Sequence, residues 1–160
     1  MSESRTHLVR RAGAADLAGL LELRIAMGRE IGGSLEPERE AAHRERVRAY
    51  LAAELGSESF AVFVAAEPDG RLLATASVRV VHRAPHPRSR RLGEAQVTGV
   101  YTIPAERGRG LAREVVTACL DQARTWRVRR AWLRTSAAGR RVYEGLGFTD
   151  PGNYLQLDLD

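Results

Sequence analysis

The segment that most constrains the fold is the junction at residues 100–112, which reads VYTIPAERGRGLA. An apolar run ends at Pro104, a turn containing Gly108 and Gly110 follows, and a helical pattern begins directly after the turn. A further apolar run lies beyond that helix. A strand, a helix and a second strand in this order favour a right-handed crossover. We therefore expect residues 94–103 and 131–135 to lie side by side as a parallel pair.

The remaining pattern predicts a mostly antiparallel sheet preceded by two helices. Short apolar runs bounded by turn residues indicate strands, at residues 7–11, 60–66, 72–82, 94–103, 131–135 and 154–159. Helical spacing predicts helices from Asp16 to about Gly32, from Pro37 to Gly56, and after the glycine turn. The 160 residues are enough for one domain, which we assign to residues 1–160 and to the α+β class.

The glycine turn has the properties of an anion site. The first amides of a helix have no acceptor inside it and carry the positive end of the helix dipole. Gly108 and Gly110 place no β-carbon between an anion and those amides, and Arg107 and Arg109 add positive charge. The spacing is neither a nucleotide P-loop nor GxGxxG. An ordinary tight turn between a strand and a helix remains the alternative.

A second segment, TSAAGRRVYEGLGF at residues 135–148, reads as a strand end, a short helix carrying Tyr143, and Phe148 at the start of another strand. Together, the RGRGLA turn, the long helix and the VYEGLGF segment resemble the GNAT superfamily of acetyl-CoA-dependent N-acyltransferases. The resemblance is strong over residues 94–148. It implies a mostly antiparallel sheet of six to seven strands, with a splayed parallel pair at its centre and about four flanking helices.

The resemblance also implies roles for individual residues. The turn would bind the coenzyme A pyrophosphate, and the pantetheine arm would lie between the splayed strands. The implied cofactor-binding residues are Val100, Tyr101, Thr102, Arg107, Gly108, Arg109, Gly110, Leu111, Ala112, Ser136, Arg140 and Tyr143. At Ser136 many members of the family have an asparagine, but a hydroxyl can also form hydrogen bonds.

Acetyl transfer to an amine needs a proton acceptor for the amine and a proton for the leaving thiolate. Tyr143 is the candidate acid, since a phenol is a neutral donor at pH 7. Glu94 is the candidate base, because an even separation from Val100 places both on one face of an unbulged strand. A solvated carboxylate at the start of the strand is an equal alternative for Glu94, and Glu106 is a weaker candidate acid.

These observations predict an N-acetyltransferase that moves an acetyl group from acetyl-CoA to a primary amine by direct attack in a ternary complex. A coenzyme A-binding regulatory or sensor domain without turnover is the alternative. The acceptor remains open among small amines, amino acids, peptide N-termini, lysine side chains and aminoglycosides. By the resemblance, the first two helices and their loop, residues 14–55, would select it.

Composition narrows the other possibilities. The net charge is +5 and all 25 basic residues are arginine, but only residues 83–91 concentrate them, without interleaved aromatic residues. We therefore expect no nucleic-acid partner. The histidines and Cys119 have no metal-ligand spacing, so we expect no metal. One cysteine and no long apolar segment predict a cytoplasmic protein without membrane contact. A homodimer is left open.

Overall fold

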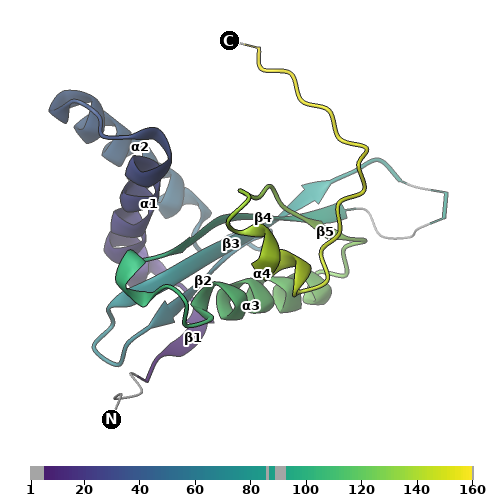
Figure 1. The fold of residues 1–160 in the computed structure, drawn as a ribbon, viewed down its shortest axis with the longest axis horizontal. Coiled ribbons are helices and arrows are strands. Elements are labelled where there is room, and N and C mark those ends of the chain that lie inside the picture. Colours follow the sequence, from purple (N-terminus) through teal and green to yellow (C-terminus); the bar gives the residue numbers. More distant parts are fainter. Residues whose placement is uncertain (1–5, 86, 89–92, 160) are drawn as a thin grey trace.

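The computed structural model describes residues 6–85, 87–88 and 93–159. The chain forms a layered α+β fold in which one sheet separates two groups of helices (Figure 1). The class and the single mixed sheet agree with the sequence prediction. The arginine-rich segment at residues 83–91 lies only partly within the described residues.

Within the described residues, the sheet has five strands in the order β1-β2-β3-β4-β5. The first three neighbouring pairs are antiparallel, and β4 and β5 are parallel, as predicted. This parallel pair lies at the edge of the described sheet and not at its centre, because β5 is the last strand in the order. Their bounds are β1 Leu8–Arg11, β2 Phe60–Ala66, β3 Leu72–His82, β4 Gly93–Thr102 and β5 Ala131–Trp132. The bounds of β2 and β3 are those predicted from the sequence.

Four α-helices accompany the sheet in the part of the chain that the structure describes, in agreement with the prediction. They are α1 Leu17–Gly32, α2 Pro37–Glu54, α3 Leu111–Thr125 and α4 Arg140–Glu144. Proline occupies the first position of α2, where its missing N–H costs no helical hydrogen bond. A short 3₁₀ turn at Pro104–Glu106 joins β4 to the glycine turn before α3.

Each face of the sheet has its own apolar core. On one face, Val115, Val116 and Cys119 of α3 pack fully buried against small side chains of the sheet such as Ala76. On the other face, α1 and α2 cover a second cluster, to which α2 contributes one buried residue, Leu51. The sheet is therefore buried between helices, and its functional surface must lie where this cover ends.

A β-bulge interrupts the pairing of β4 with β3. Thr75 pairs with Tyr101 and Ser77 pairs with Thr98, so one residue of β3 faces two residues of β4. Gly99 lies in the bulge with φ +61°, a value that side-chain-bearing residues rarely adopt. The extra residue reverses the alternation of side chains along the rest of β4.

The parallel pair is short. β4 and β5 pair only at Ala95 with Ala131 and at Gln96 with Trp132. Past these positions, the two chains part, which is the splay that the family resemblance implied. The bulge and the splay affect the same stretch of β4, from Val97 to Thr102.

The predicted strand at residues 154–159 is wrong, and the sheet formed by residues 6–85, 87–88 and 93–159 has five strands where six or seven were predicted. Tyr154 is held against Arg134, but beyond it the chain extends away from the sheet (Figure 1), and Leu155 and Leu157 are 97% and 80% exposed. The alternation of apolar residues is present, yet a strand also needs a partner for its backbone groups. The two-residue β5 offers a short edge for such pairing.

Leu51 gives a test of how α2 is attached. Its side chain is 2% exposed in the cluster that also contains Leu20 and Phe60. We expect Leu51→Ala to lower the free energy of unfolding by about 2–5 kcal/mol, because it removes buried methyl groups and leaves a cavity. Urea unfolding with an unchanged m value would measure the loss. The control Leu35→Ala, at a 43% exposed position, should change it by less than about 0.5 kcal/mol. A loss below 1 kcal/mol for Leu51→Ala would contradict this packing.

Candidate active site

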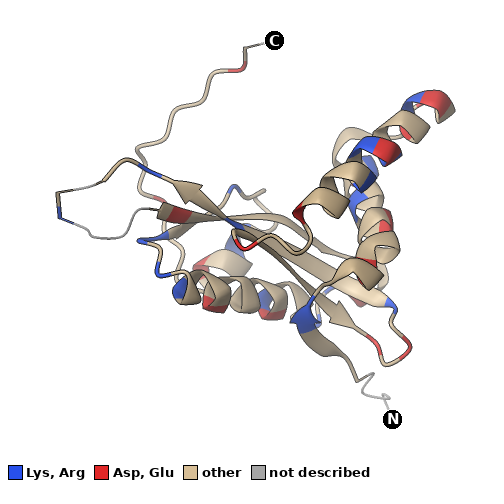
Figure 2. Ribbon diagram, turned by 180° about the vertical axis from the view of Figure 1, so that it is seen from behind, with Lys and Arg blue, Asp and Glu red and all other residues tan. Residues whose placement is uncertain are grey.

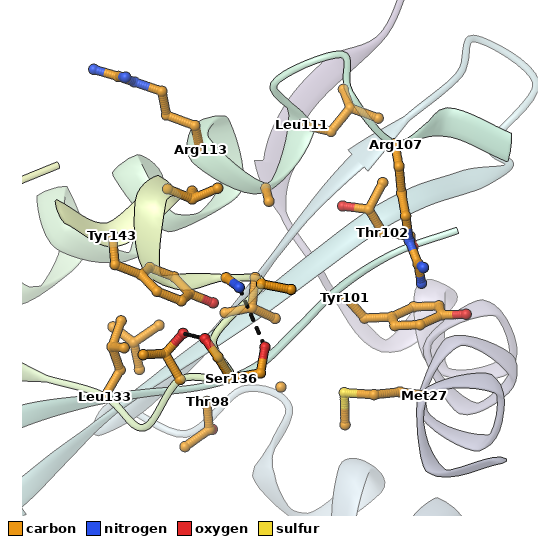
Figure 3. Close-up of a pocket in the computed structure, with 18 of the residues that line it drawn as sticks. Met27, Thr98, Tyr101, Thr102, Arg107, Leu111, Arg113, Leu133, Ser136 and Tyr143 are labelled. Carbon is orange, nitrogen blue, oxygen red and sulfur yellow. Dashed lines mark hydrogen bonds between the residues drawn. The ribbon is translucent and has the colours of Figure 1, made fainter. Parts of the chain in front are cut away.

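A cleft of about 760 Å³ opens where β4 and β5 part (Figure 3). Its walls come from the second half of β4, the glycine turn and start of α3, the segment after β5, α4 and the last part of α1. The residues that line it include Met27, Glu30, Ile31, Val97, Thr98, Gly99, Val100, Tyr101, Thr102, Glu106, Arg107, Gly108, Gly110, Leu111, Ala112, Arg113, Leu133, Arg134, Thr135, Ser136, Ala138, Gly139, Val142 and Tyr143.

The turn at residues 107–112, here called the donor turn, forms one end of the cleft. Gly108 and Gly110 have φ values of +78° and +83°, and a β-carbon on either would point into open space. The first backbone bond of α3 runs from the Glu114 amide to the Gly110 carbonyl at 3.1 Å. The preceding amides of α3 therefore have no acceptor within the helix, and the open side of the turn can hold an anion.

The Arg107 side chain leaves the donor turn and crosses the cleft wall. It donates to the Thr102 carbonyl at 3.0 Å and to the Glu30 carboxylate at 2.7 Å, and its guanidinium lies 5.6 Å from the centre of the Tyr101 ring. Figure 3 shows it beside Tyr101 and above Met27. The hydrogen bond from Arg107 lowers the pKa of Glu30. The ion pair and the hydrogen bond to Thr102 together connect α1 to the end of β4. Arg107 therefore has a structural role in addition to its position in the donor turn.

Tyr143 on α4 forms the opposite wall from Thr102 (Figure 3). Its ring is half-buried and meets Phe148 edge to face, with the ring centres 6.1 Å apart. Burial raises the pKa of the Tyr143 phenol, which therefore stays protonated at neutral pH. The side chain combines a packed ring with a hydroxyl directed into the cleft.

The Thr102 hydroxyl is buried and has no hydrogen-bond partner among the described residues. Thr102 is 8% exposed and lines the cleft at the end of β4. A buried polar atom of this kind costs free energy unless it is paired. A ligand with polar groups along β4 would therefore find an available partner there.

Glu94 does not lie in the cleft. Arg129 donates to its carboxylate at 3.0 Å, Arg83 at 3.2 Å, and Arg130 lies 3.6 Å away. Burial alone would raise the pKa of Glu94, but these three arginines outweigh that effect and hold the pKa below its usual range. A carboxylate with a lowered pKa is a poor proton acceptor. Glu94 instead connects the segment that follows β3 with the segment that precedes β5.

The bulge explains why the expected juxtaposition of Glu94 and Val100 does not occur. Ala95, Val97 and Val100 all pack in the cluster on the α3 face. An unbulged strand would have kept Val100 on the same face as Glu94. The extra residue at the bulge instead places them on opposite faces.

Most of the predicted cofactor-binding residues do line the cleft, and two do not. Val100, Tyr101, Thr102, Ser136, Tyr143 and the donor turn apart from Arg109 are brought together. Arg109 pairs with the buried Glu106, and Arg140 pairs with Glu144 at 2.7 Å. Their side chains are thus engaged elsewhere, and Arg109 contributes to the turn by position alone.

The residues of α1 are the main addition to the predicted site. Met27, Glu30 and Ile31 line the cleft, and we call this part, together with Tyr101, the acceptor side. The sequence pattern predicts a helical face here but contains no motif, because a methionine and an isoleucine at helical spacing are equally consistent with an ordinary core. Only the tertiary fold brings this helix against the bulge of β4.

The described residues offer no other obvious chemistry. Cys119 is fully buried in α3, and burial raises the pKa of its thiol far above neutral. No group of three or more potential metal ligands occurs in the described ranges. Within the same ranges, no helix is both long enough and apolar enough to span a membrane.

Comparison with known proteins places this site in a family. A model of the acetyltransferase (GNAT) family matches residues 27–148, which contain the donor turn, the splayed pair and Tyr143. The chain belongs to the acetyltransferase (GNAT) family. No curated protein sequence matches it significantly. The family supports acetyl transfer as the general class of reaction.

Solved structures share the whole fold. A predicted acetyltransferase from Clostridium acetobutylicum, solved with acetyl-CoA, is 23% identical, with 96% of this chain and 97% of that chain covered and a TM-score of 0.81. A GCN5-related N-acetyltransferase from Ralstonia eutropha is 22% identical, with 97% and 100% covered and a TM-score of 0.78. At these identities the likeness concerns the fold.

The arginines around Glu94 predict an acid-sensitive contribution to stability. Because the pKa of Glu94 is lower in the folded than in the unfolded chain, its contribution is complete above about pH 4.3 and is lost as the pH falls through the folded pKa. Urea unfolding between pH 3 and 6 should show Glu94→Gln less stable by on the order of 2 kcal/mol at pH 6, with the difference shrinking toward pH 3. A difference that does not change with pH would contradict this role. The control is Asp121→Asn, which removes an exposed ion pair with Arg124 and should change the free energy of unfolding little at pH 3 or pH 6.

Proposed function

We propose that the protein transfers the acetyl group of acetyl-CoA to a primary amine by direct attack, with both substrates bound at once. The observation that carries this proposal is the donor turn, whose two left-handed glycines open onto the gap between β4 and β5. An anion site that continues into a slot between two parting strands fits a long ligand with a diphosphate at one end. The family assignment gives that ligand its chemical identity.

The cleft has the features that the donor requires. The diphosphate would accept hydrogen bonds from the amides of the donor turn and the first turn of α3. The extended pantetheine arm would lie along β4, where Val100, Tyr101 and Thr102 no longer face β5. The unpaired Thr102 hydroxyl gives one polar partner for the arm or the thioester.

The chemistry needs few side chains. The amine nitrogen attacks the thioester carbonyl carbon, and the carbon–sulfur bond breaks. The departing sulfur takes the proton of the Tyr143 hydroxyl, which is protonated before the reaction because burial raises its pKa. Water then returns a proton to Tyr143, so the residue acts as a general acid and is regenerated.

We propose that water takes the proton of the amine, either before or during the attack. Glu94 lies outside the cleft under three arginines. The two carboxylates that do line the cleft are each paired with an arginine, Glu30 with Arg107 and Glu106 with Arg109. All three carboxylates are thus held by arginines, which also lower the pKa of Glu94 and of Glu30, so we assign none of them as the base.

The direct experiment is thiol release from acetyl-CoA in the presence of a panel of primary amines. Amine-dependent release supports the enzyme. Tight binding of acetyl-CoA without release for any amine would favour the alternative, a coenzyme A-binding sensor domain. Failure to bind acetyl-CoA would overturn both.

Gly110 tests whether the donor turn holds the diphosphate. We expect Gly110→Ala to weaken the binding of coenzyme A by about tenfold or more, because the new β-carbon occupies the open side of the turn and strains a left-handed position. Isothermal titration with coenzyme A measures this. Gly70→Ala is a matched control, since Gly70 also has a positive φ, +91°, and open space at its β-carbon, but lies in the turn between β2 and β3. Equal affinity in the two variants would argue against the turn as the phosphate site.

Tyr143 tests the proposed acid. Tyr143→Phe keeps the packed ring and removes the proton donor, so kcat should fall by about 10²–10⁴-fold while the affinity for acetyl-CoA changes little. Steady-state kinetics of thiol release separate the two quantities. Tyr154→Phe, at an exposed position of the C-terminal segment, is the control. Unchanged turnover in Tyr143→Phe would remove this residue from the chemistry.

A further inference from the structure

Arg24 lies in contact with the β-bulge of β4 that shapes the cleft. The guanidinium of Arg24, on α1, lies so close to Gly99 that a β-carbon on this glycine would be 2.6 Å from its Nη2 and 2.9 Å from its Cζ. Gly99 and its neighbour Thr98 both line the cleft. Because Gly99 has no side chain, the guanidinium of Arg24 can occupy the space next to its Cα, at the edge of the cleft.

Arg24 belongs to the same face of α1 as the acceptor side. Residues three and seven positions apart lie on one side of an α-helix, and Arg24, Met27 and Ile31 have this spacing. Met27 and Ile31 line the cleft. Arg24 is not itself a lining residue, but its guanidinium lies against Gly99, which lines the cleft, so the helix places one cation at this wall beside two apolar side chains.

Three other arginines close to Arg24 have acidic partners, and the remaining arginines of α2 are exposed to solvent. Arg29 pairs with Glu40, Arg44 pairs with Glu22, and Arg107 pairs with Glu30. Figure 2 shows acidic and basic residues interspersed along the two N-terminal helices. These charges compensate one another on the protein itself.

Arg24 differs in that it makes no ion pair or hydrogen bond with any of the residues that the structure describes. Its electrostatic interaction is with Tyr50, whose hydroxyl already accepts a hydrogen bond from Arg79 at 2.9 Å. Burial lowers the pKa of Arg24, yet a guanidinium stays charged at any physiological pH. A partly buried cation with several unused donors is costly to the fold unless something else pairs with it.

We infer that Arg24 binds an anionic group, a carboxylate or a phosphate, on the amine that accepts the acetyl group. A planar guanidinium donates two parallel hydrogen bonds to either anion, which suits both the position and the missing partner. A neutral amine would leave the cation covered and unpaired, and a polycationic amine would be repelled. This inference rests on the proposed function and narrows it to small amines that carry a negative charge.

Matched amines test the inference by thiol release from acetyl-CoA. One pair is an amino acid and its amide, and the other is phosphoethanolamine and ethanolamine, so that the two anions are tested separately. The wild-type protein should have a higher kcat/KM for the anionic member of at least one pair. Arg24→Met should lower that kcat/KM by about tenfold or more. It should leave unchanged both the kcat/KM for the member without the anionic group and the KM for acetyl-CoA. Arg24→Lys should restore part of the loss.

The control is Arg29→Met, which removes one positive charge from the same helix at the position paired with Glu40. It should keep the preference for the anionic amine. A preference that is absent in the wild-type protein, equal losses for anionic and neutral amines in Arg24→Met, or the same loss in Arg29→Met would each overturn the inference.

A binding measurement separates this inference from the proposed function. If no amine causes thiol release, the anion site can still be tested by binding. Calorimetric titration of the coenzyme A-bound protein with the N-acetyl amino acid and with N-acetylphosphoethanolamine measures the affinity for each anion. Binding by the wild-type protein that is lost in Arg24→Met would support the anion site at Arg24 even though the proposed acetyltransferase activity is rejected. Equal binding by both proteins, or none by either, would overturn the site.

Discussion

The bulge at Gly99 is the constraint on which the site depends. It adds one residue to β4 against β3, close to where β4 ceases to pair with β5. Without it, the alternation along β4 would continue, and Val100 would face away from the α3 side where it now packs. The same glycine admits the guanidinium of Arg24 from the other face. One backbone irregularity thus shapes the cleft between β4 and β5 and its wall beside α1.

Charge is arranged around this irregularity in two different ways. Glu94, below the splay, is enclosed by three arginines and fastens the ends of two loops. Arg107, above it, joins α1 to the end of β4 through Glu30. In both clusters the arginines bind a carboxylate of the protein itself, so these contacts hold the frame of the cleft. Arg24 has no acidic partner among the residues that the structure describes, and in our proposal it binds the acceptor instead of bracing the fold.

Much of this architecture could be predicted from the sequence, for local reasons. The strands β2 and β3 are bounded by turn residues, and the turn at Gly108 and Gly110 carries its own conformational signal. The position of Glu94 could not be predicted, because an extra residue in a strand leaves no periodic trace except a glycine. The strand at residues 154–159 failed because pairing depends on an edge elsewhere in the chain. Met27 and Ile31 carried no signal of a site, since their role arises from the packing of α1 against β4.

The burial of Cys119 has a practical consequence for studying the reaction. It is the only cysteine of the chain, it lies fully buried on the side of α3 that faces the sheet, and burial keeps its sulfur protonated. Colorimetric reagents that react with thiolates should therefore leave the folded protein unlabelled. The sulfur that they report would come from coenzyme A, so the progress of each turnover could be followed continuously without a background from the protein.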